Sequence, residues 1–358
     1  MDDPPSGVES SRSLVPSRLL DPQALRRPAP RSGVLARFGV VLAACALSGA
    51  GAGLFLLRPS RSPLVVAQDG HARPPLGDFT AGSAAPFQGA GAWVDVWDYA
   101  TTYQDPGEAP VVGPADVAAM AASGARTLYL QTAGEGRTVG PTEDPGQLGR
   151  FLAAAHARGV RVVGWYAPSL HDPSEDLVRL LTVAHFSAGG EHFDGLAVDV
   201  DVDQTSPKDR SQLLALSRRL RAEAGPRFPL ALIVPPTAAL EQAELPFPWR
   251  PLDRLYDAWI PRIAWTPGGE DRAGPAARTR SSVVRLRELV GDPGAAVHPL
   301  GGMGGAVTES EARAFLRAAA DTGAIGASVY DFRSTPAGTQ SEIGIASAGG
   351  FGDRELSE

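Results

Sequence analysis

Residues 193–201 read Phe-Asp-Gly-Leu-Ala-Val-Asp-Val-Asp, an apolar segment that ends in two carboxylates. Side chains alternate between the two faces of a strand, so Asp199 and Asp201 share one face and the neighbouring valines share the other. Two charges at the end of an apolar strand are costly unless they face a polar cleft. The segment therefore predicts a buried strand that carries a carboxylate pair into a cleft. The alternative is an Asp-rich cap that accepts hydrogen bonds from loop amides.

Further apolar stretches alternate with helical patterns along the chain. Together with the first segment they cover residues 92–99, 125–132, 161–168, 193–201, 229–236, 257–265, 296–303 and 326–332. The helical pattern over 146–158, for example, begins after Asp144-Pro145 and ends at Gly159. Eight β–α units in about 240 residues predict a (β/α)8 TIM barrel. A doubly wound open sheet is the alternative, although no glycine-rich phosphate loop follows the first strand.

The active site of such a barrel lies at the carboxyl ends of its strands. The side chains there that we expect to bind substrate are Asp95, Trp97, Asp98, Gln131, Trp165, Tyr166, Arg262, Trp265, His298, Tyr330 and Asp331. Flat aromatic rings beside acidic acceptors suit sugars, which present apolar C–H faces and a fringe of hydroxyls. The alternative for each aromatic residue is packing in the core, and for His298 it is a hydrogen-bonded place in the barrel lining.

The run FDGLAVDVD resembles strand four of the chitinase-type (family 18) glycoside hydrolases, whose pattern is F-D-G-L-D-I-D-W-E. Asp194 and Asp199 match that pattern, whereas Ala197 replaces an aspartate and Asp201 replaces the terminal glutamate. Segments such as GARTLYLQT, RVVGWYAP, LYDAWIP and GASVYDF also resemble secreted actinobacterial barrel proteins of glycoside-hydrolase type. The resemblance implies that Asp201 is the general acid and that Asp199 is its electrostatic and hydrogen-bonding partner. The shorter side chain of Asp201 would have to be matched by a closer backbone.

Two functions are compatible with this pattern. The first is a membrane-anchored extracytoplasmic glycoside hydrolase that acts on a cell-surface or environmental glycan by carboxylate acid/base catalysis. The alternative is a cell-wall glycan-binding or assembly factor with a degenerate, non-catalytic barrel site. Facing carboxylates about 5–5.5 Å apart suit retention and about 6.5–9.5 Å suit inversion. The sequence leaves open the sugar, the linkage, the anomeric outcome, the competence of Asp201 and the oligomeric state.

Composition argues against other chemistries. The six histidines show no metal-ligand spacing and a single cysteine cannot build a zinc cluster, so we expect no metal and no other cofactor. No Gly-x-Ser-x-Gly or Walker-type motif occurs. The chain has 33 basic and 40 acidic residues, a net charge of −7, so its composition does not indicate a basic surface that would bind nucleic acid. The expected partner is therefore a polysaccharide or cell-wall glycan.

The amino-terminal region predicts a membrane anchor. Residues 1–36 are rich in Pro, Ser and Arg and read as a disordered cytoplasmic tail. Residues 37–57 form the predicted signal-anchor, since 38–57 carry no charge and are long enough to cross a hydrocarbon core of about 30 Å. The excess of arginine before this segment orients the barrel outward. The alternatives are a lipoprotein processed at Cys45 and a secreted protein with a cleaved signal.

The remaining boundaries follow from composition. Residues 58–90 contain several Pro, Gly and Ser and predict a flexible linker between membrane and barrel. Residues 91–335 hold the barrel. Residues 336–358 are rich in Gly, Ala and Ser and predict a disordered tail.

Overall fold

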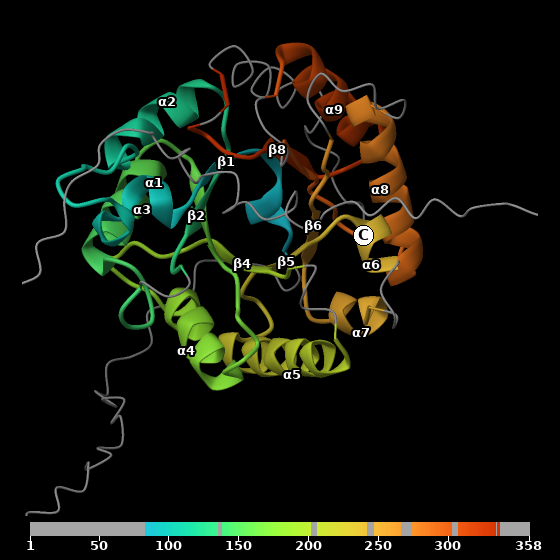
Figure 1. Cartoon of the computed structure of the whole chain (residues 1–358), viewed down its shortest axis with the longest axis horizontal. Coiled ribbons are helices and arrows are strands. Elements are labelled where there is room, and N and C mark those ends of the chain that lie inside the picture. Colours follow the sequence, from blue (N-terminus) through green and yellow to red (C-terminus); the bar gives the residue numbers. More distant parts are fainter. Residues whose placement is uncertain are drawn as a thin grey trace, which may run out of the picture.

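The computed structural model describes residues 83–134, 138–201, 206–241, 247–265, 274–302, 307–333 and 335–336. Its centre is a sheet of eight parallel strands with helices around it (Figure 1). The strands are β1 (Gly89–Val94), β2 (Thr127–Gln131), β3 (Arg161–Tyr166), β4 (Gly195–Asp199), β5 (Leu230–Val234), β6 (Ala258–Pro261), β7 (Leu300–Gly301) and β8 (Gly326–Val329).

The sheet closes on itself. Strands β1 to β6 pair in chain order, and β8 pairs with both β1 and β7. The parallel bridges Trp259–Val297 and Arg262–Leu300 join the β6 segment to the β7 segment. The predicted (β/α)8 TIM barrel is therefore confirmed.

Helices cover the outside of the barrel (Figure 1). The α-helices are α1 (Val96–Tyr99), α2 (Val117–Ala122), α3 (Pro145–His156), α4 (Pro173–Ala184), α5 (Pro207–Ala224), α6 (Thr237–Glu241), α7 (Trp249–Asp253), α8 (Gly274–Val290) and α9 (Glu309–Asp321). Short 3-10 turns cover Ala85–Phe87, Thr101–Tyr103 and Pro114–Asp116. The helix predicted over 146–158 is α3, and the Asp144 carboxylate caps it by accepting from the Gly146 and Gln147 amides.

Strand alternation divides the core into two layers. Side chains such as Trp93, Tyr129 and Ala197 fill the barrel interior, and the rings of Trp93 and Tyr129 stack with centroids 4.2 Å apart. Their neighbours in sequence, such as Leu128 and Val198, pack outward under the helices. Because rings fill the interior, a ligand has room only beyond the strand ends.

The first strand is shorter than the sequence pattern suggested. A strand was predicted over 92–99, but β1 stops at Val94. Asp95 instead caps the single-turn helix α1, with its Oδ1 accepting a hydrogen bond of 2.9 Å from the Trp97 amide. A short polar side chain before a helix favours this local bond over strand extension. Trp97 and Asp98 therefore project from a helical turn rather than from the strand.

The barrel begins slightly before residue 91, the boundary predicted from composition. Gly89 already pairs with Gly326 of β8, and the Phe87 side chain is fully buried in the inner core. The predicted tail (1–36), the signal-anchor (37–57), most of the linker and nearly all of the tail from 336 lie outside the described residues. Within the part of the chain that is described, no helix is both long and apolar enough to cross a membrane.

Candidate active site

Asp199 and Asp201 meet a common cation at the carboxyl end of the barrel. Asp199 is the last residue of β4, and Arg262 directly follows β6. The NH2 nitrogen of Arg262 lies 3.4 Å from Asp199 Oδ1 and 3.7 Å from Asp201 Oδ1. The same nitrogen donates a hydrogen bond to the Val200 carbonyl. The predicted catalytic pair is therefore brought together, with Arg262 as its shared counter-charge.

The two carboxylates of the pair differ in environment. The side chain of Asp199 is 14% exposed and that of Asp201 is 41% exposed. Burial raises the pKa of Asp199 from an ordinary 3.8 to about 6, while the charge of Arg262 opposes this rise and that of Asp201 adds to it. Asp199 thus takes up a proton at a pH at which an ordinary aspartate is ionised.

Several buried polar atoms near the pair lack a hydrogen-bond partner among the described protein groups. They include Trp165 Nε1, Asp199 Oδ1 and Arg262 Nε. Such an atom costs about 1–3 kcal/mol if nothing satisfies it. Two of these atoms donate and one accepts, and a sugar hydroxyl can do both. These buried atoms make the surroundings of the carboxylate pair polar.

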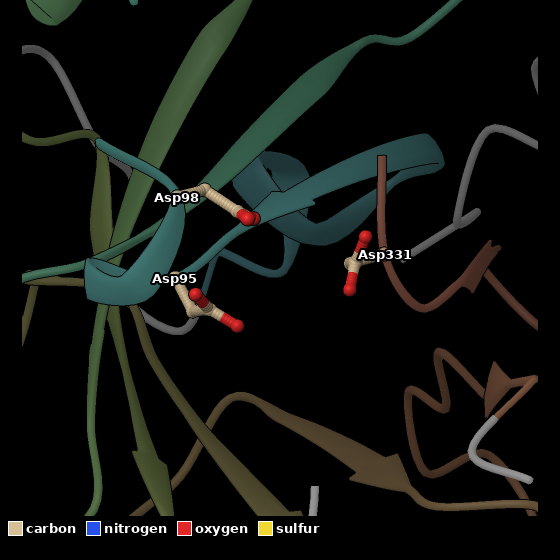
Figure 2. A group of neighbouring side chains, drawn as sticks. All are labelled: Asp95, Asp98 and Asp331. Carbon is tan, nitrogen blue, oxygen red and sulfur yellow. The ribbon is translucent and has the colours of Figure 1, made fainter. Parts of the chain in front are cut away.

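A second group of carboxylates lies at the ends of β1 and β8. Figure 2 shows Asp95 and Asp98 from the start of α1 and Asp331 from the segment after β8, with their carboxylates turned toward a common space. One oxygen from each lies within 4.8 Å of the others, and all three residues are buried. These are the residues that could hold a cation in the described part of the chain. The sequence expectation of no metal rested on histidine and cysteine spacing and did not consider carboxylates so far apart in the chain.

Protein donors already bind parts of this acidic group. The Tyr330 hydroxyl donates to Asp95 Oδ2 at 2.8 Å, and Arg333 NH1 lies 3.5 Å from Asp98 Oδ1. The sequence interpretation named Tyr330 but missed Arg333. The sequence signal that could have identified Arg333 is its position two residues after Asp331.

Gln131, the last residue of β2, and Trp97, within α1, also lie at this end of the barrel. The Oε1 atom of Gln131 accepts from the Val96 amide at 3.1 Å, which holds α1 on the end of β2. Trp97 is half-buried and meets the Tyr103 ring edge to face, with centroids 4.9 Å apart. Both contacts therefore help to position the carboxylates of Asp95 and Asp98.

Tyr166 and Trp265 have partners on the outside of the barrel. Tyr166 follows the inward Trp165, so alternation turns it outward, where its hydroxyl donates to Asp176 Oδ1 of α4 at 2.8 Å. Trp265 lies beyond the end of β6 and packs on Phe315 of α9, with ring centroids 5.5 Å apart. The structure does not bring these two predicted substrate-binding residues to the carboxylate pair.

His298 lies inside the barrel before the start of β7. Its Nδ1 is 2.7 Å from the Phe87 carbonyl and its Nε2 is 2.7 Å from the Ser328 hydroxyl. Because a carbonyl only accepts, Nδ1 carries the proton and Nε2 accepts from Ser328. Burial lowers the pKa of His298 to about 4, so the ring is neutral at ordinary pH. This is the hydrogen-bonded lining that the sequence left as the alternative.

Comparison with solved structures identifies glycoside hydrolases of the same fold. A GH5_18 enzyme from Streptomyces cattleya, solved with GlcNAc, has a TM-score of 0.55 and 13% identity over 72% of this chain and 79% of that chain. An endo-β-1,4-mannanase from Thermotoga petrophila has a TM-score of 0.53 and 9% identity over 78% and 80%. The C-terminal domain of a candidate chitinase from Desulfitobacterium hafniense has a TM-score of 0.52 and 10% identity over 74% and 99%. No protein-family model and no curated protein matches the chain. At these identities the likeness establishes the barrel fold.

Proposed function

We propose that the protein is a glycoside hydrolase that cleaves its glycan at the Asp199–Asp201 pair. Asp201, the more exposed carboxylate, protonates the leaving oxygen, and Asp199 is its electrostatic and hydrogen-bonding partner. The observation that carries the proposal is that both carboxylates share Arg262 while burial raises the pKa of Asp199 to about 6. Asp199 therefore holds a proton at a pH at which an ordinary aspartate is ionised, and a carboxylate pair that can hold such a proton is suited to acid catalysis.

The surroundings of the pair support a sugar as the substrate. Trp165 offers a ring and an Nε1–H that has no hydrogen-bond partner among the described protein groups. Asp199 adds a carboxylate that pairs with Arg262. The neighbours of similar fold include enzymes whose names refer to mannan and chitin and one bound to GlcNAc. Polysaccharide or cell-wall glycan is therefore the proposed substrate class.

The anomeric outcome depends on the second group that assists the reaction. One route uses an acetamido group of the substrate, oriented by Asp199, as the internal nucleophile. The other uses a carboxylate of the Asp95, Asp98 and Asp331 group, which lies on strands separated from β4 by β2 and β3 on one side. The first route limits substrates to N-acetyl sugars, whereas the second leaves any glycoside open.

A glycan-binding protein without turnover is the second candidate. The observation that favours it is the position of Arg262, which lies within ion-pair distance of both carboxylates and neutralises charge that acid/base chemistry would use. In that case the same surface binds a glycan through its hydroxyl groups and no bond is cleaved.

The two candidates differ in product formation. The purified full chain is incubated with chitin oligosaccharides, mannan and peptidoglycan, and both new reducing ends and retained glycan are measured. We expect reducing ends with the wild type and a loss of about 100-fold or more in Asp201→Asn. Asp209→Asn, which changes a capping aspartate at the start of α5, is the matched control and leaves turnover intact. Retention without new reducing ends in the wild type would support the binder.

We also propose that residues 38–57 anchor the barrel outside the cell membrane. The support is the uncharged sequence of this segment and the arginines that precede it. Protease added to intact cells should digest the barrel and spare an amino-terminal epitope. A barrel that is protected until lysis would contradict this orientation, and a shorter protein with a lipid on Cys45 would favour the lipoprotein.

A further inference from the structure

A cavity lies beside the carboxylate pair, where the ends of β5 and β6 meet the first half of α8. Its volume is about 380 Å³, within the range of about 300–1,000 Å³ that is usual for small-molecule sites. The polar residues that line it are Thr237, Arg262, Arg278, Ser281 and Ser282. Arg262 therefore borders both the cavity and the Asp199–Asp201 pair.

The polar lining is graded from a buried floor to an exposed rim. Thr237 and Arg262 are each 5% exposed and Ser282 is 8% exposed, whereas Arg278 and Ser281 are exposed. A ligand group that enters past Arg278 would thus reach buried donors at the bottom. Buried donors bind more strongly than exposed ones because water competes less.

Two of the floor residues hold polar atoms without a partner. Neither Ser282 Oγ nor Arg262 Nε has a hydrogen-bond partner among the described protein groups. A helical serine or threonine usually bonds the carbonyl four residues back, as Thr279 of the same helix does to Pro275 at 2.7 Å. The Ser282 hydroxyl does not make this bond. Ser282 therefore places a buried polar group without a protein partner in the wall of the cavity.

The charge of the lining selects the ligand. Two arginines and three hydroxyl residues border the cavity, and no carboxylate stands among the described lining residues. Guanidinium groups present planar N–H donors that match the oxygens of carboxylates and phosphates. The first turn of α8, which reaches the cavity at Ala277, adds the positive end of a helix dipole.

We propose that this cavity binds an oxyanion substituent, a carboxylate or a phosphate, of the glycan that is cleaved at the neighbouring carboxylate pair. The proposal rests on the proposed function, because it assigns the substrate class of that site as acidic glycans. Arg262 links the two halves of the site, since it lines the cavity and pairs with both aspartates. An acidic sugar seated there places its neighbouring glycosidic bond toward β4.

The test measures binding without requiring turnover. The full chain is titrated calorimetrically at low ionic strength with glucose, glucuronate, glucose 6-phosphate and inorganic phosphate. We expect glucuronate, glucose 6-phosphate or both to bind at least about tenfold more tightly than glucose, since one charge-assisted hydrogen bond is worth about that factor. The acidic sugar that binds more tightly identifies the substituent. Equal affinity for glucose and both acidic sugars would overturn the proposal.

Substitutions on α8 locate the binding. Arg278→Gln should weaken acidic-sugar binding about tenfold, and Ser281→Asp, which adds a negative charge at an exposed rim position, should abolish it. Arg280→Gln is the matched control, because Arg280 pairs with Asp321 at the surface and does not line the cavity. Acidic-sugar binding that is unchanged in both Arg278→Gln and Ser281→Asp would place the anion elsewhere.

The two proposals fail in different ways. Asp201→Asn should keep the preference for acidic sugars while losing any turnover. If acidic sugars bind but no glycan is cleaved, the hydrolase is refuted and the oxyanion site stands. If neutral glycans are cleaved and acidic sugars bind no more tightly than glucose, the oxyanion site is refuted. If inorganic phosphate binds as tightly as either sugar, the cavity holds a free anion and the assignment to a glycan substituent is wrong.

Discussion

Asp199→Asn should stabilise the protein at neutral pH, although it removes a proposed active-site carboxylate. The pKa of Asp199 is about 6 in the folded protein against an ordinary 3.8, chiefly because burial penalises its charged form. Above that pH the folded state must hold a buried charge, which the nearby Arg262 offsets only in part. Asparagine has nearly the same shape and carries no charge, so the substitution removes this cost.

The size and sign of the effect follow from proton linkage. Between the ordinary and the folded pKa, the folded state binds the proton more tightly than the unfolded state, so the wild type loses stability as the pH rises through this window. A tenfold change in proton affinity is worth about 1.4 kcal/mol, which gives a total loss of about 3 kcal/mol. The variant does not titrate at this position. The advantage of Asp199→Asn over the wild type should grow by about 2.5 kcal/mol from about pH 4 to about pH 7.5, because part of the loss has already occurred at pH 4.

Equilibrium unfolding in guanidinium chloride at the two pH values measures this difference. Asp201→Asn is the control, because its side chain is 41% exposed and we expect a change of about 0.5 kcal/mol or less. If Asp199→Asn is destabilising at neutral pH, or if its effect is the same at both pH values, Asp199 does not carry the buried charge that the argument requires.

Two further predictions separate the barrel lining from the mouth. Burial lowers the pKa of His298 to about 4. The stability advantage of the wild type over His298→Gln, measured by unfolding curves, should therefore shrink by about 3 kcal/mol as the pH falls from about 6.5 to about 4. A difference that stays constant would mean that His298 is not buried as a neutral ring. Trp165→Phe should weaken binding of the best-cleaved panel glycan about fivefold through loss of the Nε1–H donor, whereas Trp265→Phe, on the outer face, should leave affinity unchanged. Equal losses in both variants would remove Trp165 from the glycan site.

The barrel could be predicted from the sequence because its strands are short apolar runs separated by strong helix signals. Strand four is the clearest case, since its alternation correctly placed Asp199 on the inward face with Ala197. The same rule applied to strand three would have turned Tyr166 away from the mouth, since Trp165 faces inward. The error arose because Trp165 and Tyr166, which are adjacent in the sequence, were both assigned to the substrate site.

The carboxylate contacts could not be predicted from the sequence. Asp95 ends its strand by capping a helical turn, and this choice depends on a local hydrogen bond that hydrophobic periodicity does not reveal. The pairing of Arg262 with both aspartates joins β4 to β6 across β5 and depends on barrel closure. Long-range polar contacts of this kind leave no spacing pattern in one sequence.

Incorporation of solvent oxygen tests the central claim most directly. The full chain is incubated in ¹⁸O-labelled water with the glycan that gives the most new reducing ends, and the products are analysed by mass spectrometry. Hydrolysis predicts one heavy oxygen at each new reducing end with the wild type and none above background with Asp201→Asn. Product formation without the label, or labelled product that persists in Asp201→Asn, would contradict hydrolysis at the Asp199–Asp201 pair.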